Sequence, residues 1–463
     1  MSLSKDRSLN EQLAAELRGM VHPSRVLSDA ASLVHYSRDL GPFESAPMPA
    51  IVVLAESVEE VQHSVRVAGL RRVAVVPRGA GTGLSGGAMA LQGCIILSLE
   101  RMNRILEIRP MDEMAVVEPG VINADLNTAV EPHGLMYAPD PASHRISTIG
   151  GNVATNAGGL RCAKYGVTRD SVLALDVVLA DGTLIHTGHD TFKGVAGYDL
   201  TALFVGSEGT LGIIVGITVR LKYLPVRSRT LAAFFDDVPA AAAGVLAIGT
   251  ARVQPAVLEL LDGNTLQVLD SAYGSNLRRR GGSLLLIQTD GFGAEAEAEV
   301  VREALVNLGA SVSAESGGEA ERLLDLRRNA RGDDVEDEFR VGEDVAVPRS
   351  KLVHYVAELE RMARDHNVLL KVVAHAGDGN LHPTFWIRTS EGDAGLARLD
   401  SALDESIGAA LALGGTITGE HGVGEYKLRW LSWEQGADLQ RIQRGIKQLF
   451  DPHGILNPGR AIA

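Results

Sequence analysis

Three blocks of small residues constrain the fold of this chain more than any other feature of its sequence. The first, at residues 77–88, reads Pro-Arg-Gly-Ala-Gly-Thr-Gly-Leu-Ser-Gly-Gly-Ala and directly follows an apolar run. The second lies at residues 147–160 and the third at residues 206–214. Backbone of this glycine density loses much conformational entropy on folding unless something fixes it. We therefore expect one long ligand to lie across an α+β domain that contains all three blocks.

The first block contains a spacing that imitates a different kind of site. Gly81, Gly83 and Gly86 match the glycine fingerprint of nicotinamide-binding Rossmann units. That fingerprint needs its third glycine to open a helix. Only about six residues separate Gly87 from the next expected strand, whereas a parallel crossover through a helix needs roughly a dozen. The block therefore predicts a nest of backbone N–H groups suited to a pyrophosphate, and not a nicotinamide site.

Apolar periodicity predicts the elements around these blocks. A strand at 50–55, a helix at 58–69 and a strand at 72–76 make an α/β beginning, and Ser57 with Glu60 forms the capping box of the helix. One helix at 122–133 and a loop region at 139–166 follow. Further short strands are expected at 94–99, 105–108, 115–118, 171–179 and 212–221. This first part is α+β in character.

The pattern changes near residue 224, where strands begin to alternate with helices. Strands are expected at 229–235, 258–260, 283–289, 311–314 and 369–374. Helices are expected at 239–249, 294–309, 352–366, 398–413 and 437–450. This alternation predicts a second domain, in which an antiparallel sheet carries helices on one face.

Composition excludes several classes of function. A net charge of −14 argues against a nucleic-acid partner, which would need a basic face. The longest apolar runs are too short to span a membrane, and the N-terminal residues contain no stretch of signal-peptide type. Cys94 and Cys162 are too few for a disulfide framework. We expect a protein of the cytoplasm, or one bound peripherally at the inner face of the membrane.

Two short segments near the C-terminus gather ionisable side chains among glycines. They are His-Ala-Gly-Asp-Gly-Asn-Leu-His at 375–382 and Gly-Glu-His-Gly-Val-Gly at 419–424. Imidazole and carboxylate together make a ligand set that suits Zn, Mn or Fe. Glu420 and His421 are neighbours, so on an extended segment they face different directions. One of them can bind a metal while the other faces a substrate, which predicts a metal with a base beside it.

Taken in order, the three blocks resemble the FAD-binding domain of the vanillyl-alcohol-oxidase superfamily. The resemblance rests on Pro-Arg-Gly-Ala-Gly-Thr-Gly at 77–83, Gly-Gly-Asn-Val-Ala-Thr-Asn-Ala-Gly-Gly at 150–159 and Gly-Ser-Glu-Gly-Thr-Leu-Gly-Ile at 206–213. The two C-terminal segments resemble its D-2-hydroxyacid dehydrogenase branch, which includes D-lactate dehydrogenase (cytochrome), D-2-hydroxyglutarate dehydrogenase and the D subunit of glycolate oxidase. The resemblance runs from about residue 49 to about residue 458.

The resemblance implies the domain organisation. The fold would be α+β, with a two-part FAD-binding domain of the vanillyl-alcohol-oxidase (PCMH) type and a substrate or cap domain whose antiparallel sheet is covered by helices. We expect an N-terminal helical segment over residues 1–45, the FAD-binding domain over 46–225, the substrate domain with the metal site over 226–420, and a C-terminal helical segment over 421–463 that returns to the FAD-binding domain.

The resemblance also implies which residues hold FAD. Residues expected at the pyrophosphate are Arg78, Gly79, Ala80, Gly81, Thr82, Gly83, Leu84 and Ser85. Residues expected to line the cofactor are Pro141, Ile149, Gly150, Ala157, Gly158, Gly159, Gly166, Ile213 and Asn457, although Asn457 also fits the start of a turn. Some members tether the flavin through a histidine of the pyrophosphate loop. This loop has none, so we expect FAD to be bound non-covalently.

In the branch, two histidines and a glutamate bind a divalent metal (Zn, Mn or Fe). Here these residues would be His375, His382 and Glu420, and His421 would be the base. An arginine ahead of an Asn-Ala pair binds the substrate carboxylate in the branch, and the sequence Arg-Arg-Asn-Ala at 327–330 points to Arg327. A charge run of this kind is also common on a solvated helix face.

The implied activity is oxidation of a D-2-hydroxy acid to the 2-oxo acid, with hydride transfer to flavin N5 and proton abstraction by His421. The 2-hydroxyglutarate enzymes carry a lysine shortly before an Asp-x-x-x-Pro motif, whereas here Gly342-Glu343 precedes Asp344-Val-Ala-Val-Pro348. They also carry an asparagine where this chain has Thr384. Both departures favour D-lactate or glycolate over a dicarboxylate.

Several alternatives remain open at the level of the sequence. The chain could be the flavin subunit of a multi-subunit glycolate oxidase that needs an iron–sulfur partner, a D-2-hydroxyglutarate dehydrogenase, or a flavin enzyme for another alcohol. A metal-dependent hydrolase would leave the three glycine blocks unexplained. The expected electron acceptor is a cytochrome, a quinone, an electron-transfer flavoprotein or an iron–sulfur subunit. The expected assembly is a homodimer or part of a complex.

Overall fold

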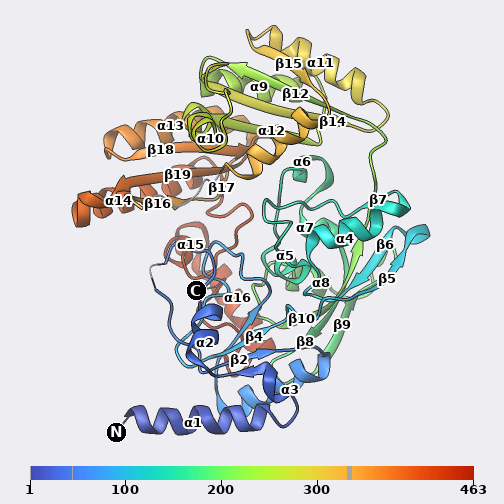
Figure 1. Ribbon diagram of the computed structural model, residues 1–463, viewed down its shortest axis with the longest axis vertical. Helices are drawn as coiled ribbons and strands as arrows, with labels where there is room; N and C mark the ends of the chain where they lie inside the picture. Colours follow the sequence, from blue (N-terminus) through green and yellow to red (C-terminus); the bar gives the residue numbers. More distant parts are fainter. Residues whose placement is uncertain (1, 44, 331–335, 463) are drawn as a thin grey trace. The chain divides into compact units, whose positions relative to one another are not determined.

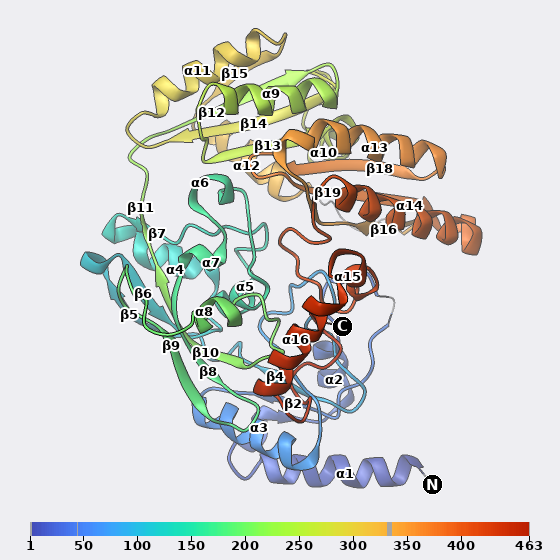
Figure 2. The same ribbon diagram turned by 180° about the vertical axis from the view of Figure 1, so that it is seen from behind.

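The computed structural model of this chain describes residues 2–43, 45–330 and 336–462, and it divides into two compact units (Figures 1 and 2). The first unit holds residues 1–157, 167–224 and 420–463, and the second holds 158–166 and 225–419. Residues 158–166, which the sequence groups with the FAD-binding part, thus cluster with the second unit. None of the helices in the described residues is long and apolar enough to cross a membrane.

The first sheet of the first unit has the strand order β1-β2-β4-β3. Its strands are β1 (Val26–Leu27), β2 (Ile51–Leu54), β3 (Val75–Arg78) and β4 (Ile95–Ser98). Its helices are α1 (Ser2–Leu17), α2 (Ala30–Ser37) and α3 (Val58–Arg71). Side chains alternate across the strands, so Ile51 and Val53 pack in one apolar cluster with α1 and α3, whereas Val52 packs in another with α2.

Strands β3 and β4 are parallel, with Val75 opposite Ile95. Residues 79–94, which join them, contain no helix, as the sequence predicts. The crossover is nevertheless parallel, which the loop length did not indicate. The short connection excludes a crossover helix but not a parallel pair, because a glycine-rich loop can cross over without forming a helix.

The second sheet of the first unit is antiparallel, with the order β5-β6-β10-β8-β9. Its strands are β5 (Ile105–Arg109), β6 (Met114–Val117), β8 (Val172–Val178), β9 (Leu184–Gly188) and β10 (Ile213–Arg220). The short strands β7 (Leu135–Met136) and β11 (Lys222–Tyr223) pair separately. The remaining helices of this unit are α4 (Asn123–Val130), α5 (Ile149–Thr155), α7 (Thr168–Ser171), α8 (Leu200–Phe204), α15 (Leu428–Glu434) and α16 (Ala437–Phe450).

The region 139–166, expected to be loop, contains short helices. The side chain of Thr148 accepts the N–H of Gly151 and so caps the start of α5. Asn156 ends that helix in the left-handed conformation, with φ +53°. A second short helix, α6 (Cys162–Tyr165), lies in the segment that clusters with the second unit. The helices escaped prediction because glycines disfavour helix, while local caps and packing overrode that preference.

The second unit is built on one antiparallel sheet with the order β15-β12-β14-β13-β18-β19-β16, and β17 also pairs with β19. Its strands are β12 (Ser228–Phe235), β13 (Val257–Asp262), β14 (Ser283–Asp290), β15 (Ser311–Glu315), β16 (Glu338–Gly342), β17 (Val345–Ala346), β18 (Leu369–His375) and β19 (Asn380–Arg388). Its longer helices are α9 (Val238–Thr250), α10 (Gly263–Tyr273), α11 (Ala294–Val306), α12 (Gly318–Arg328), α13 (Leu352–Asp365) and α14 (Gly392–Ala412).

Helices cover both faces of this sheet, and not one face as the alternation predicted. Leu284 and Leu286 of β14 pack in one apolar cluster with α10 and α12. Leu285 points to the opposite face. There it lies near Gly244 of α9, which also approaches Leu305 of α11. Strand residues that are apolar on both faces allow this arrangement, which the order of elements along the chain does not reveal.

Candidate functional site

His375 and His382 lie on one hairpin of the second unit. His375 ends β18 and pairs with Asn380 of β19, while His382 pairs with Val373. Side chains two residues apart on a strand share a face, so the two imidazoles project from the same side as diagonal neighbours. Their ring centroids are 5.1 Å apart, edge to face. The tight hairpin thus brings together the two histidines that the sequence singles out.

A buried glutamate from the neighbouring strand β13 fixes His375. Glu259 lies directly opposite His375 in the sheet, and its Oε1 is 2.8 Å from Nδ1 of that ring. Because a carboxylate accepts, Nδ1 carries the proton, which puts the acceptor lone pair on Nε2. This is the carboxylate–imidazole arrangement that orients metal-binding histidines. Glu259 could not be predicted as a site residue from the sequence, because nothing in its apolar strand indicates its partner.

Arg327 comes from α12 and reaches the same carboxylate. Its Nε is 2.5 Å from Oε2 of Glu259, and its side chain is only 6% exposed. The terminal Nη2 of Arg327 lies 3.4 Å from Nδ1 of His375. Both nitrogens are donors, and the Glu259 carboxylate is the acceptor that the two side chains share. Arg327 is therefore not on a solvated helix face. The Asn-Ala motif singles out this arginine, but burial and ion pairing are properties of the fold.

Asp344 holds the chain just ahead of the second histidine-bearing segment. Its fully buried carboxylate accepts the N–H of Gly419 at 2.9 Å, the hydroxyl of Thr418 at 2.7 Å and the amide of Asn380 at 2.8 Å. Its Oδ1 also lies 3.8 Å from Nδ1 of His382. A Cβ at Gly419 would clash with the Asn380 amide, so only glycine fits. In the sequence Asp344 stands out only as the start of the Asp-x-x-x-Pro motif, which does not reveal this contact.

Glu420 and His421 follow Gly419 directly and are the first residues of the first unit in this segment. Their side chains approach each other at one point, with His421 Nε2 4.0 Å from Glu420 Oε1. The hydroxyl of Ser85 lies 3.4 Å from the carbonyl oxygen of His421, and the Ser85 carbonyl accepts the N–H groups of Glu425 and Tyr426. The segment therefore rests on the first glycine block through residues of the same unit.

The first and third glycine blocks and residues 147–157 of the second approach one another within the first unit. A Cβ at Gly79 would clash with the Thr148 hydroxyl of the second block, and a Cβ at Gly209 would clash with Pro77 of the first. Asn457 donates to the carbonyls of Gly87 and Glu208 at 2.9 and 2.7 Å, so it does more than start a turn. These contacts bring the blocks close to one another.

The expected FAD residues fall in both units. Arg78–Ser85, Pro141, Ile149, Gly150, Ala157, Ile213 and Asn457 belong to the first unit, whereas Gly158, Gly159 and Gly166 belong to the second. Burial lowers the pKa of Arg78, and its guanidinium lies 3.4 Å from the carbonyl of Ala88. The loop is also held by Asp39, which accepts the N–H of Ala88 at 3.2 Å. Burial raises the pKa of that carboxyl.

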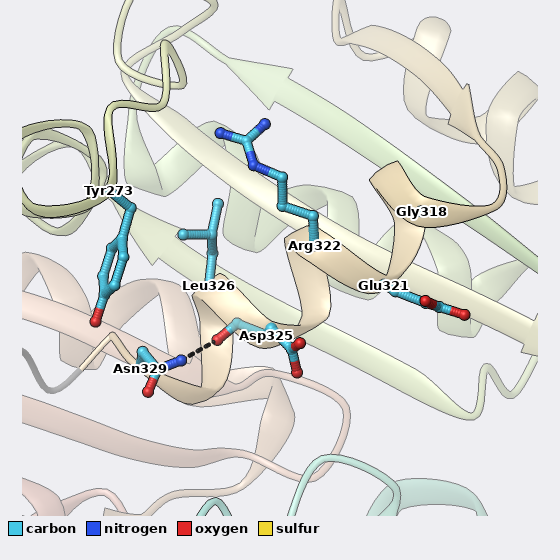
Figure 3. A pocket seen from close by; sticks show the side chains of 7 residues that line it. All are labelled: Tyr273, Gly318, Glu321, Arg322, Asp325, Leu326 and Asn329. Atoms are coloured by element: carbon cyan, nitrogen blue, oxygen red, sulfur yellow. Dashed lines mark hydrogen bonds between the residues drawn. The ribbon is translucent and has the colours of Figure 1, made fainter.

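A surface hollow of about 440 Å³ lies beside α12 (Figure 3). It is lined by Tyr273, Gly318, Glu321, Arg322, Asp325, Leu326 and Asn329. Within it Asn329 donates to the carbonyl of Asp325 at 2.8 Å. Arg327 does not line the hollow, so this feature is separate from the cluster of Glu259, Arg327 and His375.

Comparisons with known proteins agree with this arrangement. A family model described as "FAD binding domain" matches residues 49–188, and one described as "FAD linked oxidases, C-terminal domain" matches residues 224–461. The glycolate oxidase subunit GlcD of Bacillus subtilis (strain 168) is 42% identical over 441 residues, which cover 94% of this chain and 93% of that protein. A D-lactate dehydrogenase of Anaerostipes hadrus is 32% identical, with 95% of each chain covered.

The fold is shared with solved structures of much lower sequence similarity. The structure of p-cresol methylhydroxylase with substrate bound superposes with a TM-score of 0.81 and 18% identity, covering 97% of this chain and 96% of that one. At this identity the likeness concerns the fold alone. It bears out the expected α+β architecture of the vanillyl-alcohol-oxidase type.

Proposed function

This chain belongs to the FAD-linked D-2-hydroxyacid dehydrogenase family, and from that membership we propose that it oxidises D-lactate or glycolate to the 2-oxo acid with non-covalent FAD and a divalent metal. It is an FAD-linked hydroxyacid oxidoreductase. The observation that carries the finer proposal is the cluster in which one buried carboxylate, that of Glu259, meets both His375 and Arg327.

The chain fits FAD through its glycine blocks. The close approaches at Gly79 and Gly209 bring glycine-rich backbone of the blocks together, and successive backbone N–H groups of such a loop suit a pyrophosphate. We propose that residues 78–85 hold the pyrophosphate, and that the other expected residues line the cofactor. When bound, FAD supplies the acceptor for the hydride equivalent that leaves C2 of the substrate.

A divalent metal fits the donor set of the hairpin. Because Nδ1 of His375 donates to Glu259, the lone pair that a metal needs is on Nε2. We propose His375, His382 and Glu420 as ligands. Glu420 follows Gly419, which Asp344 holds by its N–H, and Asp344 also lies beside His382. When bound, such an ion would lower the pKa of a coordinated hydroxyl well below its usual value.

The remaining roles belong to Arg327 and His421. A guanidinium can hold a carboxylate through two parallel N–H bonds, which orients C2 of a 2-hydroxy acid. FAD, when bound, would accept the hydride equivalent from C2 of the substrate, and the imidazole of His421 would accept the hydroxyl proton. A neutral imidazole is a suitable acceptor near pH 7.

The preference for a short monocarboxylate rests on the strand next to the histidines. Thr384 is two residues beyond His382 on β19, so it projects from the same face of the sheet. Gly342 lies opposite Thr384, and the buried carboxyl of Glu343 follows it. A second substrate carboxylate would thus find a hydroxyl where the 2-hydroxyglutarate enzymes carry an asparagine, and the chain has Gly342-Glu343 and not a lysine just ahead of Asp344.

A second candidate is the flavin subunit of a glycolate oxidase complex. It is favoured by the 42% identity to a protein named as such a subunit. In that case electrons would pass from FAD to an iron–sulfur partner chain. A cytochrome, a quinone or an electron-transfer flavoprotein would accept them otherwise.

The test is anaerobic reduction of the FAD-loaded protein, followed by the loss of flavin absorbance at the visible maximum. D-Lactate or glycolate should bleach the flavin, L-lactate and D-2-hydroxyglutarate should do so far more slowly, and EDTA treatment should suppress the reaction until metal is restored. Fully loaded protein that no 2-hydroxy acid reduces would refute the proposal. Reduction that occurs only with an added iron–sulfur chain would favour the complex.

A further inference from the structure

Glu208 occupies an unusual position in the third glycine block. It lies between α8 and β10, its side chain is buried, and its backbone φ is +51°, a conformation uncommon for a residue with a Cβ. Its N–H donates to the carbonyl of Ala154 at 2.8 Å, and its carbonyl accepts the amide of Asn457 at 2.7 Å. The strained conformation is thus held from both sides of the residue.

The carboxylate of Glu208 accepts hydrogen bonds from the backbone of the segment that carries His421. Oε1 accepts the N–H of Val423 at 2.7 Å, and Oε2 accepts the N–H of Gly424 at 2.8 Å. Bonds to an ionised acceptor are stronger than neutral ones. A Cβ added at Gly422 would lie 2.9 Å from Oε1, so the carboxylate also requires glycine at the residue after His421.

The opposite side of the same segment rests on Ser85 of the first glycine block. The Ser85 carbonyl accepts the N–H of Glu425 at 2.9 Å and that of Tyr426 at 3.1 Å. A Cβ at Gly424 would clash with that carbonyl oxygen. Residues 421–426 are therefore held between Glu208 and Ser85, with glycines at the points of closest approach.

We propose that Glu208 is a positioning residue for His421, fixing the backbone that carries this imidazole against the first glycine block. The inference rests on the proposed role of His421 as the base. A carboxylate suits this task because its two oxygens can each accept one of two successive N–H groups. A glutamine offers one oxygen and an NH₂ group, which would face a backbone donor.

Opposing effects act on the pKa of the Glu208 carboxyl. Burial raises the pKa of Glu208 to about 7, while the two N–H bonds and the charges of Arg460 and Lys427 act in the opposite direction. Burial of a charged carboxylate costs free energy. Such a group is suited to a site where its ionised form makes a contact that a neutral side chain cannot make.

The test compares Glu208→Gln and Glu208→Asp with a matched control. Glu113→Gln is the control, because Glu113 also has a left-handed backbone, with φ +52°, but lies in the turn between β5 and β6. Both Glu208 variants should bind FAD, and their flavin reduction by saturating substrate should slow by roughly ten- to a hundredfold, as for a misplaced reacting group. Hydrogen exchange at Val423 and Gly424 should accelerate, whereas the control should match the unaltered protein.

The outcomes separate this inference from the proposed function. If no hydroxy acid reduced the unaltered protein, the proposed function would be refuted. Hydrogen exchange would still test whether Glu208 holds the backbone of Val423 and Gly424. Reduction and exchange in Glu208→Gln equal to those of the unaltered protein would overturn the inference. Should neither Glu208 variant fold, exchange in the unaltered FAD-loaded protein decides: the amides of Val423 and Gly424 must be among the slowest of residues 420–427, and rapid exchange there contradicts the proposal.

Discussion

The guanidinium of Arg327 and the carboxylate of Glu259 form a buried ion pair, with Nε 2.5 Å from Oε2. The other oxygen of the same carboxylate lies 2.8 Å from Nδ1 of His375. One side chain of β13 thus orients an arginine from α12 and a histidine at the end of β18. The proposed carboxylate-binding group and the proposed metal ligand are tied together before any substrate arrives.

Replacing Glu259 by glutamine should weaken metal binding by roughly ten- to a hundredfold, as is usual when a partner that orients a ligand is removed. The amide can present an N–H to His375 and favour the wrong tautomer. Metal content after dialysis against graded chelator measures the effect. Glu315→Gln, at a glutamate on β15 of the same sheet, is the control. Equal metal retention in the two variants would contradict the assignment.

Replacing Arg327 by lysine keeps the charge and loses the fork of N–H groups. We expect the substrate concentration at half-maximal flavin reduction to rise by roughly ten- to a hundredfold, the range that hydrogen bonds to charged groups imply. Stopped-flow reduction over a range of substrate concentrations measures it. Arg322→Lys, at a residue of the same helix that lines the surface hollow, should behave as the unaltered protein. An unchanged half-saturation value would remove Arg327 from this role.

Replacing His421 by alanine should leave FAD bound and slow flavin reduction by roughly 10²- to 10⁴-fold, the usual contribution of a positioned base. The flavin spectrum reports occupancy, and anaerobic reduction reports the chemistry. His453→Ala is the matched control, since His453 is exposed after α16. Near-normal reduction by the His421 variant would mean that another group accepts the proton.

The pKa of Glu208, raised by burial from 4.5 to about 7, predicts a pH dependence of stability. Between these values the folded chain binds a proton more tightly than the unfolded chain, so the free energy of unfolding should fall as pH rises from about 4.5 to about 7. The full shift corresponds to roughly 3 kcal/mol. Urea unfolding of FAD-loaded protein should show this fall, and Glu208→Gln should lack it. If the free energy of unfolding depended on pH in the same way in both proteins, Glu208 would not be the cause of the fall.

Replacing Gly209 by alanine should disrupt the junction of the first and third glycine blocks, because its Cβ would clash with Pro77. Gly134→Ala is a matched control: its φ is +69° against +71° at Gly209, but its Cβ would meet open space. The control should lose only the roughly 1–2 kcal/mol of a left-handed residue with a Cβ. FAD content and melting temperature measure both variants. Full FAD occupancy in Gly209→Ala would show that the junction does not shape the cofactor site.

Much of the local structure could be predicted from the sequence. The strand expected at 369–374 is β18 and delivers His375, and the helix expected at 437–450 is α16. Apolar periodicity and capping residues act within a few residues of one another, so they are legible along the chain. The absence of a helix in residues 79–94 followed from the same local reasoning.

Other features could not be predicted from local patterns. The helices of the second glycine block, the parallel pairing of β3 with β4 and the helices on both faces of the second sheet all depend on contacts between distant segments. A glycine-rich stretch has weak local preference, so its conformation is decided by what packs against it.

The sequence by itself determined the candidate site residues, namely the two histidines of the hairpin, Glu420, His421 and Arg327, through their residue types and the family motifs that contain them. Only the tertiary structure decided which carboxylate each of them meets. Glu259 meets His375, which is 116 positions later in the sequence, and Glu208 meets Gly424, which is 216 positions later. Such pairs depend on the register of whole sheets and on the path of loops, and no pattern along the chain records these.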